Sequence, residues 1–434
     1  MNKENIIDII GIGIGPFNLS LAALMHEQGM DAEFFDQTAE FEWHPGMLID
    51  GTDLQVPIIA DLVTFANPKS QFTFMNYLHT HNRLYKYFFF NKQEVPRKEY
   101  NQYAKWVAGQ LDSCHFGKKV VDVLDHNGCY EAVVEDVDTG ERKSWFAKHI
   151  VMGTGSTPLV PDGLKGQPRE DVFHSSEFLC KKEKAVQSDS ITVIGSGQSA
   201  SEIFLTLLKE QKDHSYKLAW FTRSEGILQL ESSKIGQEFF SPDYIDYFHR
   251  LSFEQRKNAL DTLEHLRNGI DYSTLNDIYD YLYDESSEKE KRDIIIQPLT
   301  EINGIEKMGN KYVLSCEQWQ EEKEFDFESE KVVLATGYKP NIPSWFEDRF
   351  GEKIVWEDEK RFKVSRDYKL VFKEERDHQF FVLTNLVHSH GAAATNLGLS
   401  VERNISIINA VAGREVYQDQ KGTIFSQFTI DAQK

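Results

Sequence analysis

Two glycine-rich turns constrain the fold of this chain more than any other feature. They read Gly-Ile-Gly-Ile-Gly-Pro at residues 11–16 and Gly-Ser-Gly-Gln-Ser-Ala at residues 195–200, and each stands between an apolar run and a helical stretch. Glycines at these spacings allow a tight turn and a close approach of the backbone to a pyrophosphate, which sits at the N-terminus of the following helix. Two such turns in one chain predict two dinucleotide-binding units.

The segments around both turns repeat one order, which is strand, helix and strand. They are residues 6–10, 18–27 and 32–36 at the first turn, and residues 190–194, 199–211 and 218–221 at the second. Short apolar runs that end in glycines are typical of buried parallel strands. The order therefore predicts an α/β fold with two Rossmann-like domains.

The rest of the chain predicts how the two domains are connected. The simplest arrangement builds one domain from residues 1–185 and 336–434 and inserts the other, residues 186–335, between them. Alternating segments predict hairpin strands, and they are residues 129–134, 143–147 and 312–327, with a further strand at 331–334. A polar, charged stretch at about 235–292 reads as helical, and the tract Tyr87 to Phe90 reads as core.

The ends of the second strands differ in charge between the two units. Asp36 ends the strand of the first unit, and an acid there can accept hydrogen bonds from a ribose hydroxyl. The second unit has Phe-Thr-Arg-Ser at residues 221–224, without an acid. Arg223 suits a 2′-phosphate, which favours NADPH over NADH, although a solvated surface arginine is the alternative.

Composition excludes several classes of function. The formal charge of -21 argues against nucleic acid or an anionic membrane as a partner. The four cysteines form no CxxC pair, so we expect neither a zinc site nor a disulfide framework, and no metal. No signal-peptide layout and no apolar run of about 20 residues is present, so we expect a cytoplasmic protein without membrane spans.

Four further motifs carry a resemblance to a known family. They are Gly-Ile-Gly-Pro-Phe-Asn-Leu-Ser at 13–20, Phe-Glu-Trp-His-Pro-Gly-Met at 41–47, His-Ser-Ser at 174–176 and Ala-Thr-Gly-Tyr at 335–338. With these motifs the chain, from about residue 6 to residue 413, resembles the microbial N-hydroxylating flavin monooxygenases. Members of that family hydroxylate the primary amine of lysine, ornithine or small diamines for siderophore biosynthesis.

The resemblance implies a chemistry and a set of partners. NADPH would reduce FAD, O2 would form a flavin hydroperoxide, and the neutral amine would attack it, so no catalytic side chain is expected. The first domain would hold FAD and the inserted one NADPH. The resemblance also suggests a homotetramer.

The resemblance implies site residues as well. Residues expected at FAD are Gly11, Gly13, Gly15, Pro16, Asp36, Trp43, His44, Met47, Gln55, Val121, Thr395, Asn396 and Leu397. Residues expected at NADPH are Gly195, Gly197, Gln198, Ser199, Ala200, Ser201, Arg223 and Tyr338. Residues expected at the substrate are Gln55, Ala60, Gln237, Phe240, Asn268, Asp271 and Gly398. Without the resemblance, packing for Trp43 and a capped turn for His44 would be preferred.

Three departures from the family pattern concern the substrate. Ala60 stands where the amino-acid hydroxylases have the lysine that receives the substrate carboxylate, Gly398 where the ornithine enzymes have serine, and Gln237 where they have asparagine. A carboxylate buried without a partner would cost several kcal/mol. We therefore expect an amine without an α-carboxylate, and lysine or ornithine as poor substrates.

Two substrate classes and several other functions stay open at this point. A diamine such as putrescine or cadaverine fits best, with Asp271 or Glu238 as partner of the far ammonium. Histamine would instead use an aromatic wall and one polar partner, for which Phe239, Tyr272 or His388 could serve. A disulfide reductase would need a redox cysteine pair. A Baeyer–Villiger or sulfide oxygenase would carry a longer histidine fingerprint between the two glycine turns. A non-enzymatic flavin protein would not need the second glycine turn.

Overall fold

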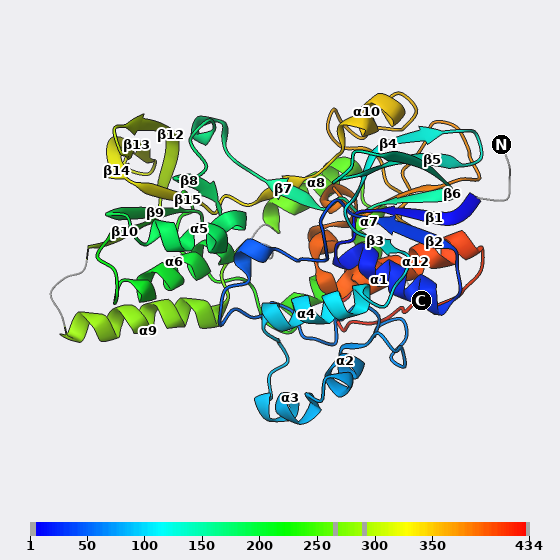
Figure 1. Cartoon of the computed structure of the whole chain (residues 1–434), viewed down its shortest axis with the longest axis horizontal. Coiled ribbons are helices and arrows are strands. Elements are labelled where there is room, and N and C mark those ends of the chain that lie inside the picture. Colours follow the sequence, from blue (N-terminus) through cyan, green and yellow to red (C-terminus); the bar gives the residue numbers. More distant parts are fainter. Residues whose placement is uncertain (1–5, 264–267, 289–292, 431–434) are drawn as a thin grey trace.

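The computed structural model describes residues 6–263, 268–288 and 293–430. Figure 1 shows two sheet-centred units side by side, and the blue and red ends of the colour scale lie in the same unit. In these ranges no helix is both long and apolar enough to cross a membrane.

The first unit is built on a seven-stranded sheet that takes strands from both ends of the chain. Its strands are β1 (Ile6–Ile12), β2 (Ala32–Phe35), β3 (Cys114–His115), β4 (Lys118–Asp125), β5 (Tyr130–Asp136), β6 (Arg142–Met152) and β17 (Phe380–Val382). The order is β3-β2-β1-β6-β5-β4, and β17 also pairs with β6. Strands β1, β2, β3, β6 and β17 are parallel, whereas β4, β5 and β6 form an antiparallel meander. This confirms a domain built from both ends.

Helices from the two ends of the chain pack together on the first unit. They are α1 (Pro16–Glu27), α2 (Phe74–Thr80), α3 (Leu84–Phe90), α4 (Arg97–Ala108), α10 (Ser344–Phe350), α11 (Val387–His390) and α12 (Ser400–Ala412). α1 lies against both α4 and α12, and its residues 18–25 are all buried. Helix α1 therefore lies inside the unit rather than at its surface.

Helix α3 corrects one expectation. The tract Tyr87 to Phe90 was expected in the core, but Phe88 and Phe89 are 69% and 76% exposed. α3 has no buried residue and protrudes with α2 from the edge of the first unit (Figure 1). A run of aromatic residues is therefore not sufficient to predict that their side chains are buried in the core of the same chain.

The second unit carries a five-stranded parallel sheet in the order β11-β10-β9-β15-β8. Its strands are β8 (Val172–His174), β9 (Ser190–Ile194), β10 (Lys217–Phe221), β11 (Ile294–Gln297) and β15 (Lys331–Leu334). Helices α5 (Phe178–Ala185), α6 (Gln198–Glu210) and α9 (Tyr272–Glu288) belong to the same unit, as does a three-stranded sheet of β12 (Thr300–Met308), β13 (Lys311–Gln318) and β14 (Lys323–Ser329). The predicted fold class, with one Rossmann-like unit inserted into the other, is confirmed.

Two connections join the units. Strands β7 (Ser156–Pro158) and β16 (Tyr338–Pro340) pair antiparallel, so the chain enters and leaves the second unit side by side. Strand β8 pairs with β15 and follows β7. The expected boundary at residue 186 is therefore too late for this sheet, because β8 and α5 precede it. The remaining domain limits stay predictions.

The helical stretch at 235–292 divides between the two units. Helices α7 (Pro242–Arg250) and α8 (Phe253–Thr262) pack on α11 of the first unit, whereas α9 packs on α6 of the second. Arg256 on α8 forms an ion pair with Glu357 at 2.5 Å, and both side chains are buried. Placing the whole stretch in the NADPH domain was therefore wrong for α7 and α8.

Candidate active site

The conformation of the first glycine turn is fixed by close backbone contacts and by side-chain hydrogen bonds. Gly13 has φ +87°, and a Cβ there would fall 2.5 Å from the carbonyl oxygen of Gly153. The side-chain amide of Asn18 donates to the Gly13 carbonyl at 2.7 Å. Asp36 accepts a hydrogen bond from the backbone N–H of Ile14 at 2.7 Å, which places this acid beside the turn, as its expected role requires.

Both helices that follow the glycine turns present free space at their N-termini. A Cβ on Gly15, before α1, or on Gly197, before α6, would meet nothing within 4 Å. Gly195 has φ +150°, and a Cβ there would lie 2.3 Å from the Ala335 carbonyl oxygen. Pro16 takes the first helical position, where its missing N–H costs nothing. Two helix N-termini with glycine approaches fit two pyrophosphates.

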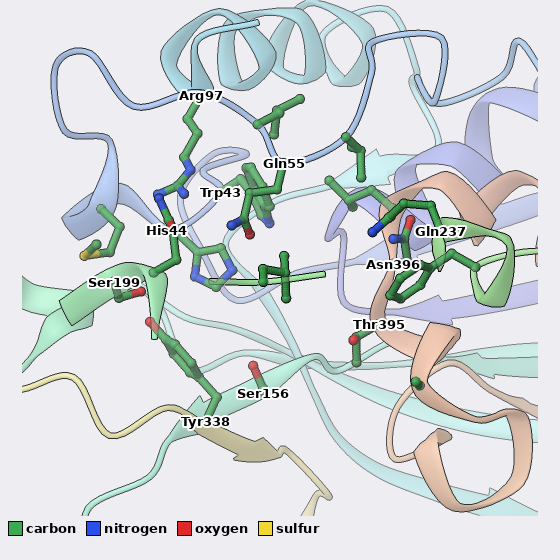
Figure 2. A pocket seen from close by; sticks show the side chains of 18 residues that line it. Trp43, His44, Gln55, Arg97, Ser156, Ser199, Gln237, Tyr338, Thr395 and Asn396 are labelled. Atoms are coloured by element: carbon green, nitrogen blue, oxygen red, sulfur yellow. The ribbon is translucent and has the colours of Figure 1, made fainter. Parts of the chain in front are cut away.

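A cavity of about 450 Å³ lies between the two units. Its lining combines Trp43, His44, Met47, Leu54, Gln55, Val56, Arg97, Ser156, Gln198, Ser199, Leu230, Gln237, Phe240, Tyr338, Ala392, Thr395, Asn396 and Leu397. Figure 2 shows these side chains arriving from several elements, with Arg97 and His44 pointing toward each other. The structure thus brings together twelve residues that the sequence predicted for FAD, NADPH or substrate.

His44 enters the cavity from a left-handed backbone position with φ 50°. Its ring lies edge-on to Tyr338 at 5.5 Å and to Trp43 at 5.3 Å. Burial lowers the pKa of His44, and the positive charge of Arg97 lowers it further. The imidazole is therefore neutral at pH 7. Trp43 and His44 both line the cavity, so Trp43 does not serve only as packing and His44 does not serve only as a turn cap.

Arg97 connects the two units at the wall of this cavity. It lies on α4 of the first unit and makes two hydrogen bonds of 2.7 Å to the carboxylate of Glu202 on α6. Glu202 also accepts from the side chain of Gln198 at 2.8 Å, and Gln198 contacts Thr274 at 3.0 Å. The network fixes Gln198, one of the residues expected at NADPH, against the first unit.

Six lining residues were missed by the sequence, and they are Leu54, Val56, Arg97, Ser156, Leu230 and Ala392. Ser156 follows the turn Gly-Thr-Gly at 153–155 at the end of β6, so a third glycine turn was the signal that could have found it. Arg97 had no local signal, because its partner Glu202 is 105 residues away.

Val121 and Arg223 are among the expected cofactor residues that lie outside the cavity lining. Val121 sits at a bulge in β4, the strand whose first backbone N–H donates to the Asp36 carbonyl at 2.7 Å. Arg223 follows β10, is 79% exposed and approaches Glu301 at 3.6 Å. Their roles at the adenosine ends of FAD and NADPH stay predictions, as do those of Ala200 and Ser201, which are buried in the first turns of α6.

Comparison with known proteins shows which family this chain belongs to. Residues 5–340 match the family model described as L-lysine 6-monooxygenase/L-ornithine 5-monooxygenase. A putrescine N-hydroxylase from Acinetobacter baumannii is 36% identical over 431 residues, which cover 99% of this chain and 95% of that protein. Another from Shewanella oneidensis is 37% identical over 435 residues, covering 98% and 84%. The chain belongs to the N-hydroxylating flavin monooxygenases.

A solved relative agrees with this assignment along the whole chain. The FAD-bound crystal structure of a cadaverine monooxygenase of desferrioxamine biosynthesis from Erwinia amylovora matches with a TM-score of 0.94 at 34% identity, covering 99% of this chain and 100% of that one. The predicted family, fold and enzyme class are confirmed. The disulfide-reductase alternative falls away. The four cysteines, all described, are free, and none lines the cavity.

Two of the three substrate departures of this monooxygenase, Ala60 and Gly398, meet in one place. A Cβ added to Gly398 would lie 3.6 Å from the Cβ of Ala60 and 2.9 Å from the side-chain oxygen of Asn396, a lining residue. Ala60 is buried. Ala60 and Gly398 thus adjoin just behind the lining, and neither offers a charge.

Three further polar residues that were expected at the substrate lie outside the cavity lining. Asn268 is exposed and outside the lining. Asp271 accepts from the backbone N–H of Ser273 at 2.8 Å and so starts α9 rather than facing the cavity. Glu238 accepts hydrogen bonds from the C-terminal segment. None of these three is placed as a substrate ligand, so the roles expected for Asn268 and Asp271, and Glu238 as ammonium partner, are not supported by the geometry.

The aromatic wall expected for histamine is also not at the cavity. Phe239 packs on Phe428, Tyr272 is 60% exposed, and the Nε2 of His388 donates to the buried Phe362 carbonyl at 2.9 Å. Among the described residues no group of three His, Cys, Asp or Glu side chains could hold a metal ion.

Proposed function

We propose that this chain uses FAD and NADPH to hydroxylate one amino group of a diamine of the putrescine or cadaverine type, for hydroxamate siderophore biosynthesis in the cytoplasm. The observation that carries this proposal is the pair Ala60 and Gly398. They adjoin, and by the family pattern Ala60 stands where the amino-acid hydroxylases have the lysine that receives the substrate carboxylate. The diamine hydroxylases among the relatives support the same substrate class.

The cofactors have fitting residues on both units. The open N-terminus of α1, with Asp36 beside the glycine turn, would hold FAD, and that of α6, with Gln198 and Ser199, would hold NADPH. When bound, FAD reduced by NADPH supplies oxygen in the electrophilic form that a neutral amine attacks. The side chains of this chain bind and orient the reactants and exclude water.

The lining bears on the protonation state of the amine. The eighteen lining residues, all described, include no carboxylate, and His44 is neutral at pH 7. The reacting amine must lose its proton because only its lone pair can attack, and no lining carboxylate can take up that proton. Activity should therefore rise as the pH approaches the amine's pKa of about 10. The far ammonium would be received by side-chain oxygens, and the Gln237 amide nitrogen already donates to the Glu231 carbonyl, which leaves its oxygen as an acceptor.

The histamine alternative has no observation in its favour, because its expected aromatic partners lie off the cavity. The test is NADPH oxidation, O2 uptake and hydroxylamine formation by the FAD-loaded protein with putrescine, cadaverine or histamine. The proposal is supported if, with a diamine, the NADPH oxidised, the O2 consumed and the hydroxylamine formed are equal in amount. Hydroxylamine from histamine alone, or NADPH oxidation that never yields hydroxylamine, would overturn it.

We further propose that the protein is a homo-oligomer, a tetramer as in the family resemblance. The exposed aromatic face of α3, with Tyr85, Phe88 and Phe89, supports this, because apolar side chains gathered on a surface commonly lie in interfaces. Light scattering of the purified protein tests it, and a monomer at micromolar concentration would contradict it.

A further inference from the structure

The C-terminal segment crosses from one part of the first unit to another. After α12, Tyr417 is anchored on α1, where its hydroxyl donates to the Leu24 carbonyl at 3.0 Å. Asn409 of α12 accepts from the backbone N–H groups of Val416 and Tyr417. The chain then continues to residues 422–428, which lie against the 3-10 turn η5 (Gly236–Phe239) and helix α7.

Two carboxylates hold this segment through its backbone. Glu238 accepts from the N–H groups of Phe425 at 2.9 Å and Ser426 at 2.8 Å, one with each oxygen. Asp243 accepts from the N–H groups of Gly422 at 3.0 Å and Thr423 at 2.9 Å. Hydrogen bonds to charged acceptors are about twice as strong as neutral ones, so these four contacts specify where the segment lies.

An aromatic cluster adds apolar contact to the same place. The ring of Phe428 lies 5.0 Å from Phe239, 4.9 Å from Tyr244 and 5.9 Å from Tyr247. Phe425, three residues earlier, is 99% exposed. The segment is therefore attached by one specific ring and by backbone hydrogen bonds, and not by general apolar burial.

The turn that receives the segment also forms the wall of the active site. Gln237 and Phe240 line the cavity on one side, whereas Glu238 and Phe239 contact the C-terminal segment on the other. η5 has no buried residue of its own. Phe240 packs on Ile245, Ala393 and Leu399, and the C-terminal segment adds contacts to Glu238 and Phe239 on the other side of the turn, which helps to hold the two lining side chains in one position.

We propose that residues 422–428 are a strap that positions Gln237 and Phe240 at the amine end of the active site, with Glu238, Asp243 and Phe428 as positioning residues. The inference rests on the proposed function for its kinetic consequence. It predicts that loss of the strap impairs use of the amine, while NADPH binding and NADPH-dependent flavin reduction, which depend on the other side of the cavity, stay as they are.

Two matched pairs of variants test the strap. A chain ending at Lys421 lacks it, whereas a chain ending at Ile430 keeps every contact named above. Phe428→Ala removes the packed ring, whereas Phe425→Ala removes an exposed ring from the same segment. For the first member of each pair we expect the KM for putrescine to rise about 10-fold or more and less hydroxylamine per NADPH, because small misplacements at a reacting centre are costly. The KM for NADPH should change less than about 2-fold. The second members should behave as the unaltered protein.

A readout without substrate separates this inference from the proposed function. Hydrogen exchange of the backbone amides at 236–240 should quicken in the chain ending at Lys421, with exchange in α6 unchanged. Faster exchange together with a raised KM supports the strap. An unchanged KM for an amine that the unaltered protein hydroxylates, or unchanged exchange at 236–240, overturns it. Failure of the unaltered protein to hydroxylate any diamine overturns the proposed function, and the exchange result then decides the strap alone.

Discussion

At the scale of single residues, we propose that the substrate class depends on two positions with almost no side chain. Ala60 and Gly398 come from opposite ends of the chain and adjoin beside Asn396. Ala60 is buried, so a charged side chain placed there would lose most of its water. Charge at this one spot is therefore expected to decide between amines with and without a carboxylate.

The first prediction concerns Ala60→Lys. A cation at this position would repel the diamine's ammonium, so the KM for putrescine should rise about 10-fold or more. The matched control is Ala60→Met, which adds similar length without charge. Steady-state kinetics at saturating NADPH measure both. A similar loss in the lysine and methionine variants would mean that size, and not charge, is responsible.

The second prediction concerns Arg223, which the structure leaves 79% exposed at the end of β10. If it receives a 2′-phosphate, Arg223→Ala should raise the KM for NADPH by about 10- to 100-fold and leave that for NADH nearly unchanged, since hydrogen bonds to charged groups contribute about 1.5–3 kcal/mol. Arg142→Ala, at another exposed arginine, is the control. Equal effects on the two nucleotides would argue for the surface-arginine alternative.

At the scale of elements, helices α4 and α6 connect the two cofactor units through one ion pair. The side chains of Arg97 and Glu202 are 14% and 4% exposed. Burial raises the pKa of Glu202, against the lowering effect of Arg97. A pair that is buried this far contributes mainly by fixing geometry, because desolvation offsets much of its attraction.

The third prediction therefore uses Arg97→Met, Glu202→Gln and the double variant. Each single change should lower the free energy of unfolding by about 3 kcal/mol, because it leaves the other charge buried and unpaired. The double variant should lose less than the sum, with a coupling of about 1–3 kcal/mol. Both single variants should also slow NADPH-dependent flavin reduction in stopped flow. Additive losses would show that the pair does not couple the helices.

Strands β6 and β17 meet at a histidine whose neutral form is required. The Nδ1 of His149 accepts from the backbone N–H of Gln379 at 2.9 Å. Burial lowers the pKa of His149 from 6.5 to about 4, with a smaller effect of Lys148. Protonation would break this contact between the two ends of the chain.

The fourth prediction follows from that shift. The pKa of His149 is lower in the folded state than in the unfolded state, so its stabilisation is present above about pH 6.5 and is lost as the pH falls toward 4. The loss in the free energy of unfolding should be about 2 kcal/mol at pH 5. His149→Gln, which keeps an acceptor but does not titrate, should unfold in urea with a smaller difference between pH 7.5 and pH 5. The exposed His79→Gln is the control, and an unchanged pH dependence in the His149 variant would contradict the assignment.

What the sequence could predict follows the same division by scale. The glycine turns and the strands at 190–194 and 331–334 appear in the structure at those residues, because their signals lie within a few neighbours. Arg97, the strap and the position of α7 depend on partners about a hundred or more residues away, and a local pattern carries no information about them. The aromatic run in α3 misled for the same reason: burial is a property of the surroundings.

At the scale of the whole molecule, the active site exists only where three parts meet. The first unit contributes Trp43 and His44, the inserted unit contributes Gln198 and Ser199, and the turn before α7 contributes Gln237. Sites between domains allow one cofactor to be brought to another while the substrate end is shaped separately. This arrangement explains how one fold can keep its cofactors and change its amine.

The central claim is that the amine carries no α-carboxylate, and one comparison tests it most directly. It is the ratio of kcat/KM for hydroxylamine formed from putrescine to that formed from ornithine, measured with the same FAD-loaded protein at saturating NADPH. A carboxylate without a cation partner should cost about 3 kcal/mol, so the ratio should be about 100 or more. Coupled hydroxylation of ornithine with a kcat/KM equal to that of putrescine would contradict the claim.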